Sequence, residues 1–129
     1  MKKKPVPCPC GRPARLDLCC GPIIEGRQAA PTPEALMRSR YTAFATGARD
    51  YLLESWHAST RPDALDLDDN PRWIGLTVVR AEETTDERAT VEFIARYRIG
   101  GKAHVLHEVS RFLREDGRWF YLDGDILSD

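Results

Sequence analysis

All four cysteines of the chain lie within residues 8–20, in the stretch CPCGRPARLDLCC. Their spacing is C-x-C, then eight residues, then C-C. Four thiolates can close a tetrahedral shell around Zn²⁺, and soft sulfur ligands favour zinc over magnesium or calcium. Pro9 and Gly11 suit the tight turn that the C-x-C spacing requires. We therefore predict one structural Zn²⁺, with the ligands Cys8, Cys10, Cys19 and Cys20.

Two other interpretations of the cysteines stay open. Buried structural cysteines would be scattered through the apolar pattern, and these are not. Redox cysteines usually occur as one thiol or as a C-x-x-C pair, whereas the adjacent Cys19 and Cys20 could form only a strained ring on oxidation. With zinc bound, the site would carry net negative charge, which Arg12, Arg15 and the run Lys2–Lys4 could offset. We expect the metal to fold residues 6–24, because so short a segment cannot build its own core.

The composition is that of a globular protein with one main domain. The chain has 129 residues, of which 42% are hydrophobic and 30% charged, and its net charge is −1. Residues 1–30 carry +4, which leaves −5 for the remainder, so the basic end is a candidate binding end. The start MKKKPVPC lacks the apolar region of a signal peptide, and no apolar run approaches the length of a membrane span. We expect a cytoplasmic protein with reduced thiols.

The elements predicted after residue 30 change from helices to strands. Residues 26–31 are the expected linker, and residues 32–47 the first helix, capped by Thr32 and followed by Gly47. A second short helix is predicted over 49–57 and a third helical turn over 59–66, where Thr60 and Asp63 fit a capping box. Alternating apolar residues then predict an antiparallel meander of four strands. The expected strands cover 73–82, 88–99, 102–115, with a possible bulge, and 118–126. The predicted class is α+β, with helices on one face of a curved sheet.

Two resemblances extend this interpretation. The stretch CPCGRPARLDLCCGP resembles the SEC-C zinc motif known from the C-terminal tail of the SecA translocation ATPase, although the usual Ser-Gly-Lys filler is missing. The segments RSRYTAFATG, DYLLESWHASTRP, WIGLTVV, VEFIARY and SRFLREDGRWFYLDG together resemble the bacterial YchJ-like family over nearly the whole chain. That resemblance implies a SEC-C knuckle, here residues 1–25, followed by a domain similar to nuclear transport factor 2, here residues 31–129. Such a domain is a cone of curved sheet backed by helices.

Polar residues among apolar ones suggest a ligand pocket in the second domain. The candidates come from the segments WHASTRP and HEVSRF: Trp56, His57, Arg61, Glu108 and Arg111. Tyr121, Asp123 and Asp125 form a further polar group in the last strand. Each also has a structural interpretation, such as a histidine at a helix C-terminus or charge pairs across strands. No nucleophile elbow, phosphate loop or H-E-x-x-H pattern occurs, so we assign no catalytic residue and do not expect an enzyme. The acidic stretch at 66–69 lacks the glycine and glutamate of a calcium loop.

Three function classes follow from these observations. The first is a zinc-binding adaptor whose knuckle presents a protein-binding surface, with the secretion or translation machinery as the partner that the SEC-C resemblance implies. The second is an enzyme or small-molecule-binding protein with zinc as a scaffold. The third is a thiol redox or nucleic-acid-binding module. Nucleic acid is the less favoured partner, because residues 1–30 contain no aromatic side chain on which bases could stack. The sequence does not predict an oligomeric state.

Overall fold

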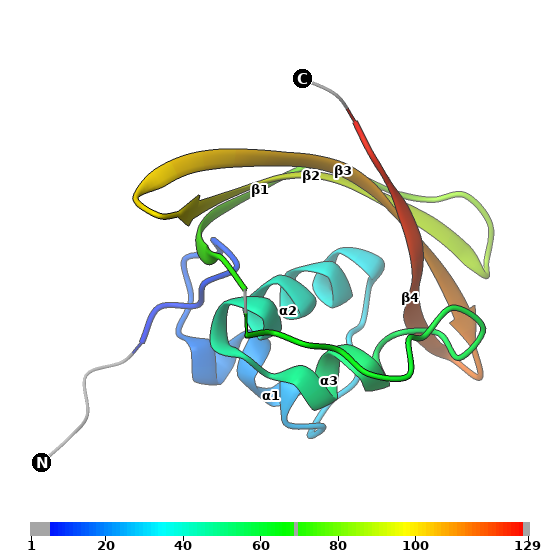
Figure 1. Cartoon of the computed structure of the whole chain (residues 1–129). Coiled ribbons are helices and arrows are strands. Elements are labelled where there is room, and N and C mark those ends of the chain that lie inside the picture. Colours follow the sequence, from blue (N-terminus) through cyan, green and yellow to red (C-terminus); the bar gives the residue numbers. More distant parts are fainter. Residues whose placement is uncertain (1–5, 69, 128–129) are drawn as a thin grey trace, which may run out of the picture.

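The protein is a curved sheet with helices packed on its concave face (Figure 1). The computed structural model describes residues 6–68 and 70–127. The helical elements are η1 (Leu16–Leu18), α1 (Cys20–Ile24), α2 (Pro33–Thr46) and α3 (Arg49–Glu54). The strands β1 (Arg72–Glu83), β2 (Arg88–Ile99), β3 (Lys102–Glu115) and β4 (Arg118–Ile126) form one antiparallel sheet in the order β1-β2-β3-β4. The predicted α+β class and four-stranded meander are confirmed.

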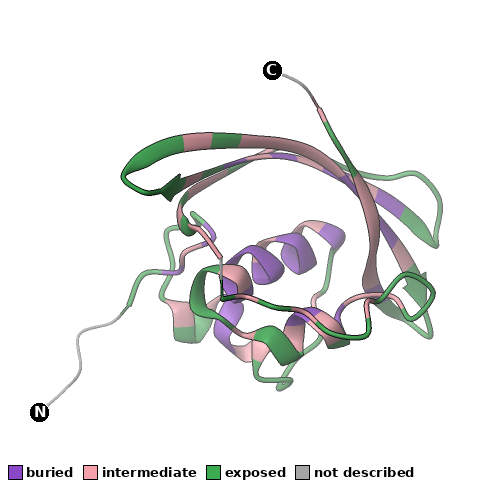
Figure 2. Cartoon of the chain, viewed as in Figure 1, coloured by how far each residue is buried: buried purple, intermediate pink, exposed green. Residues whose placement is uncertain are grey.

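The central helix α2 forms as its end signals predict. The side chain of Thr32 accepts a hydrogen bond from the backbone N–H of Ala35 at 3.0 Å, and Pro33 occupies the first helical position, where no N–H is needed. Gly47 ends the helix with φ 78°. Nine of the residues from Pro33 to Ala43 are buried, which makes α2 the most buried helix of the described residues (Figure 2). This helix therefore forms the layer between the N-terminal segment and the sheet.

The core lies between α2 and the concave face of the sheet. In β2 the alternating residues Ala89, Val91, Phe93 and Ala95 are all buried, as the period of two predicts. Ile99, at the far end of the same strand, is 55% exposed beside the β2–β3 turn. The buried cluster is completed from the other elements by Leu36, Met37, Tyr41, Phe112 and Trp119.

Three details of the predicted elements are wrong. No third helical turn forms over 59–66, because the Thr60 hydroxyl donates to the Leu122 carbonyl at 2.6 Å and ties this segment to β4. The bulge expected in the third strand lies in its neighbour: β3 pairs with β2 without a register shift, whereas Leu122 is the extra residue of β4 between two β3 partners. The second helix is also shorter than predicted and ends at Glu54. Asp69 of the acidic loop lies outside the described residues.

Within residues 6–68 and 70–127, no helix combines the length and the apolarity that crossing a membrane would require.

Candidate metal centre

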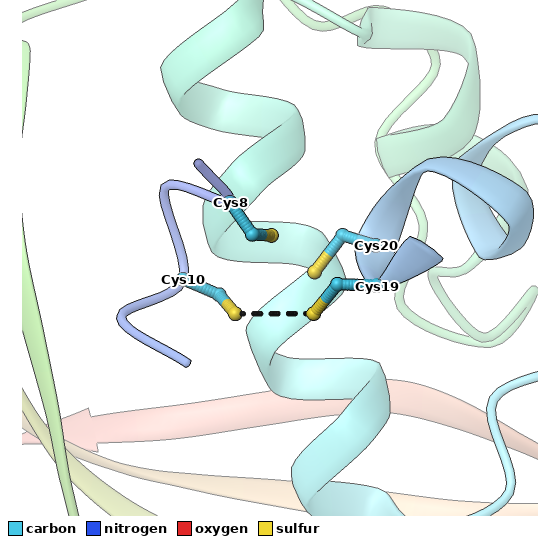
Figure 3. A group of neighbouring side chains, drawn as sticks. All are labelled: Cys8, Cys10, Cys19 and Cys20. Carbon is cyan, nitrogen blue, oxygen red and sulfur yellow. Dashed lines mark hydrogen bonds between the residues drawn. The ribbon is translucent and has the colours of Figure 1, made fainter. Parts of the chain in front are cut away.

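The four cysteines gather into one cluster, with side chains that point toward a common centre (Figure 3). Their Sγ atoms all lie within 4.8 Å of one another, and those of Cys10 and Cys19 are 3.7 Å apart. A tetrahedral zinc site with Zn–S bonds of about 2.3 Å has S–S edges of about 3.8 Å. The cluster therefore has the size of a four-thiolate metal shell, and the donor set fits a soft, tetrahedral ion. Because all four donors come from the protein, the shell would be closed.

The backbone around the first two cysteines forms a small hairpin. Pro7 and Arg15 make an antiparallel bridge, and the Cys8 N–H donates to the Ala14 carbonyl at 2.9 Å. Gly11 follows Cys10 with φ +92°, and a Cβ there would lie 3.1 Å from the Leu76 carbonyl oxygen of β1. Glycine is therefore favoured at position 11 for two reasons: the backbone is left-handed there, and it lies so close to β1 that a side chain would be crowded.

The second pair of cysteines lies where the chain passes from η1 to α1. Cys19 caps the end of the short helix η1 with φ −124° and ψ −98°, and Cys20 is the first residue of α1. This irregular backbone turns two successive side chains toward the same centre. Cys20 is only 2% exposed, whereas Cys19 is half-buried and lies nearer the surface.

The cysteine cluster is docked on the body of the protein. Cys8 Sγ lies 3.7 Å from the Thr42 hydroxyl of α2, and Arg38 of α2 donates from Nη1 to the Cys10 carbonyl at 2.7 Å. Leu76 of β1 packs against the same cluster. The cysteines therefore join the N-terminal segment to α2 and β1 instead of forming a separate lobe.

Hydrogen bonds among the thiols set their protonation. The thiol of Cys20 donates to Cys10 and lowers the pKa of Cys10 to about 4, with a backbone N–H from Arg12 acting in the same direction. Burial raises the pKa of Cys19 to about 11, and the hydrogen bond to Cys10 together with burial raises the pKa of Cys20. Cys10 is therefore the preferred thiolate of the cluster. A divalent cation bound by all four sulfurs would displace every proton that the thiols of the cluster still hold.

The charges near the cluster differ from those expected. Arg12 lies 3.5 Å from Glu34 and Arg15 lies 2.7 Å from Asp17, so both predicted counter-charges pair with carboxylates. The run Lys2–Lys4 lies outside the described residues. Sequence reasoning missed Arg38, whose guanidinium bridges Glu34 and the Cys10 carbonyl.

The structure places two of the five predicted pocket residues in one cavity. Trp56 and Glu108 line a cavity of about 290 Å³ between α2 and the sheet. His57 instead donates from Nε2 to the Glu115 carboxylate at 2.9 Å, and Arg61 donates to the Trp56 carbonyl. Neither lines that cavity.

Arg111 lies on the opposite face of the sheet from Glu108. It pairs with Asp123 and, at 2.6 Å, with Asp125 of β4, and these two carboxylates raise the pKa of the guanidinium. Arg111 and Glu108 lie an odd number of residues apart in β3, so their side chains point to opposite faces. Arg111 therefore forms a charge pair across strands, as its structural interpretation predicted, whereas the side chain of Glu108 faces the interior.

Sequence reasoning also missed Arg40 as a cavity residue. A signal was present, because Arg40 follows Met37 by three residues and precedes Phe44 by four, which puts it on the apolar face of the helix. A charged residue in an apolar stripe is the exception that marks a buried polar site.

The domain behind the cysteines agrees with a known family. Residues 32–124 match the family model described as YchJ, middle NTF2-like domain. The chain belongs to the YchJ-like family. A UPF0225 protein of Methylibium petroleiphilum is 53% identical over 126 residues, which cover 97% of this chain and 92% of that protein. The family resemblance drawn from the sequence is confirmed.

Solved structures support both parts of the YchJ-like chain. A SEC-C motif containing protein from Rhodopseudomonas palustris has a TM-score of 0.85 and 38% identity, covering 95% of this chain and all of that one. A SEC-C motif containing protein from Psychrobacter arcticus has a TM-score of 0.78 and 25% identity, covering 98% and 84%. An NTF-2 like protein from Shewanella oneidensis, 11% identical with a TM-score of 0.55, shows the fold alone over 68% of this chain. The boundary between residues 1–25 and 31–129 stays a prediction.

Proposed function

We propose that this YchJ-like protein is a zinc-binding adaptor in which one structural Zn²⁺ holds the N-terminal knuckle on the domain behind it. The observation that carries the zinc site is the closed cluster of four Sγ atoms within 4.8 Å of one another. Three of the cysteines are buried, which suits a structural ion that keeps no position for water or substrate. The reduced thiols of the cytoplasm would favour this state, and we place the protein there.

Mass spectrometry of the untagged protein tests the ion. We expect a native mass that exceeds the chain by one zinc and a denatured mass with four free thiols. A metal-free native protein whose mass is lower by the hydrogens lost to disulfides would instead make the adjacent cysteines a redox pair. A native mass that matches a metal other than zinc would still support a structural metal site, but with a different ion.

The surface of the knuckle supports the adaptor role. Leu18 is 74% exposed and Val6 is 58% exposed, so two large apolar side chains face solvent on one short module. Exposed apolar residues that a rigid module presents together are suited to a protein partner. Arg15 and Asp17, paired at 2.7 Å, lie beside them and would form a polar rim. We propose a protein of the secretion or translation machinery as the partner.

A pair of matched variants tests the docking surface. L18E puts a charge on the knuckle, whereas V105E puts the same charge on β3, where Val105 is 47% exposed. Cross-linking in cells should recover a partner with the wild type and with V105E, and lose it with L18E. Equal recovery with both variants and with a cysteine variant that binds no zinc would refute the adaptor role.

A further inference from the structure

The cavity between α2 and the sheet has apolar walls and a small polar end. Its volume is about 290 Å³. The apolar walls include Met37, Phe44, Trp73, Phe93, Leu106 and Phe112. The cysteine cluster contacts the same helix through Arg38 and Thr42, which do not line the cavity. The two sites therefore use different faces of α2, and a ligand could bind in the cavity without touching the metal.

The first polar feature of the cavity is a buried cation. Arg40 is 5% exposed, and no carboxylate of residues 6–68 or 70–127 lies within ion-pair distance of it. Its guanidinium lies 4.4 Å from the Tyr121 ring centroid and 5.1 Å from that of Trp56. Within the described chain, its hydrogen bonds to the Leu52 carbonyl and the Ser55 hydroxyl both use Nη1. The Nε and Nη2 donors are thus available to another acceptor.

The charge of Arg40 is kept at a cost. Burial lowers the pKa of its guanidinium to about 10, so the group is still a cation at neutral pH. A buried charge is normally paired, because leaving water without a counter-charge is unfavourable. Aromatic faces, neutral oxygens and the more distant Glu108 carboxylate of the same cavity offset part of that cost here. An anion bound directly to Nε or Nη2 would offset more of it.

The second polar feature is an unsatisfied donor. Trp56 Nε1 is buried and has no hydrogen-bond partner, and among the described residues it is the one buried side-chain nitrogen or oxygen in that condition. Trp56 lines the cavity, and its ring lies beside Arg40. An indole N–H can only donate, so what satisfies it must be an acceptor. Such an exception in a folded protein calls for a ligand or solvent group at that position.

The third polar feature is an acidic side chain that limits how much negative charge a ligand can carry. Glu108 lines the cavity and accepts a hydrogen bond from Ser110 at 2.7 Å. Its carboxylate lies against Gly124, where a Cβ would come within 2.6 Å of Glu108 Oε2. Glu108 also raises the pKa of the nearby Tyr121 hydroxyl, after burial, which acts more strongly. A negative group on the ligand near Glu108 would be repelled, because like charges in a low-dielectric site disfavour each other.

We propose that the cavity binds a small, mostly apolar monocarboxylate, whose carboxylate accepts hydrogen bonds from Trp56 Nε1 and Arg40. The aromatic walls contact the apolar body of the ligand. The anion satisfies the unpaired donor and balances the buried cation. Glu108 limits the negative charge that the polar end accepts and disfavours a ligand with a second carboxylate. This site goes beyond the adaptor role and does not depend on the bound metal.

Titration of the zinc-loaded full chain with three matched probes tests the proposal. Hydrocinnamate carries the apolar ring and one carboxylate, hydrocinnamyl alcohol lacks the charge, and benzylsuccinate adds a second carboxylate. Binding is followed by calorimetry at millimolar probe and by the NMR signals of the indole N–H groups. Trp119 is the internal reference, because it does not line the cavity. We expect saturable binding of hydrocinnamate, with a downfield shift of the Trp56 indole proton larger than that of Trp119.

Variants separate the proposed contacts from general apolar binding. W56F keeps an aromatic ring and removes the indole N–H. It should lower the affinity for hydrocinnamate by about tenfold or more, as expected for the loss of a hydrogen bond to a charged acceptor. E108Q removes the negative charge, so it should reduce the ratio of the affinity for hydrocinnamate to the affinity for benzylsuccinate. Equal affinity for the alcohol, unchanged affinity in a folded W56F protein, or no saturable binding of hydrocinnamate would each overturn the proposal. These readouts stay separate from zinc content and partner recovery, so this proposal and the adaptor role can fail independently.

Discussion

The attachment of the knuckle to α2 can be tested at one side chain. Arg38 donates from Nη1 to the Cys10 carbonyl at 2.7 Å and from Nε to Glu34 at 2.9 Å. Its side chain is 16% exposed, and Cys10 is fully buried. Substituting Arg38→Met keeps most of the aliphatic packing and removes both hydrogen bonds. Because one of these bonds joins the knuckle to α2, we expect zinc binding and folding stability to weaken together.

The size of the effect follows from the two contacts. A hydrogen bond with a charged donor contributes roughly 1.5–3 kcal/mol. The pair with Glu34, which is 33% exposed, adds less than about 1 kcal/mol. A loss of about 2 kcal/mol corresponds to zinc affinity about 30-fold lower, if the whole loss falls on the docked knuckle. In the metal-free protein, where the knuckle is expected to unfold, the same substitution should cost less than about 0.5 kcal/mol.

Chelator competition and urea unfolding measure both quantities. The first gives the zinc affinity, and the second gives the free energy of unfolding with zinc and after chelation. Arg49→Met is the matched control, because Arg49 is exposed at the start of α3. A zinc affinity that is the same in R38M and wild type would refute the coupling between docking and metal binding. Equal destabilisation with and without zinc would place Arg38 in the body of the protein alone.

Three further substitutions test the cluster, the core and the surface charge. C20S should lose the tightly bound zinc and expose the remaining thiols to alkylation, because Cys20 is 2% exposed and serine is a poor zinc ligand; slow alkylation of a metal-free C20S protein would contradict this. F112A should cost about 3–5 kcal/mol in urea unfolding, because Phe112 is 2% exposed, whereas V105A on the outer face should stay within about 0.5 kcal/mol. The Arg38 ion pair holds the pKa of Glu34 below its ordinary value of 4.5, so its stabilisation is present above that pH and is lost as pH falls through the lower native pKa. E34Q should therefore be less stable than wild type at neutral pH by under about 1 kcal/mol, and a difference that persists in strong acid would show another cause.

The cavity shows where sequence reasoning reaches its limit. Glu108 and Arg111 were predicted to line one pocket because both are polar residues among apolar ones, but they lie on opposite faces of β3. Alternation indicates that two such residues point apart, but not which one points inward, since the apolar pattern of this strand is mixed. Leu122, the extra residue of β4, adds a further change of phase that depends on the pairing of two strands. The position of Arg40 in the apolar stripe of α2 was visible in the sequence, but its ring partners, which come from other elements of the fold, were not.

Features that depend only on neighbouring residues could be predicted from the sequence. The four clustered cysteines lie within thirteen residues, the cap of α2 lies within one turn, and the alternation of β2 repeats every second residue. Tertiary structure alone decided which surface of α2 receives the cysteines and which faces the cavity. It also decided that Arg38 would reach Cys10 and that Arg40 would meet Trp56. These contacts join residues distant in the chain, and packing chooses them through register, bulges and helix orientation, which no short stretch of sequence encodes.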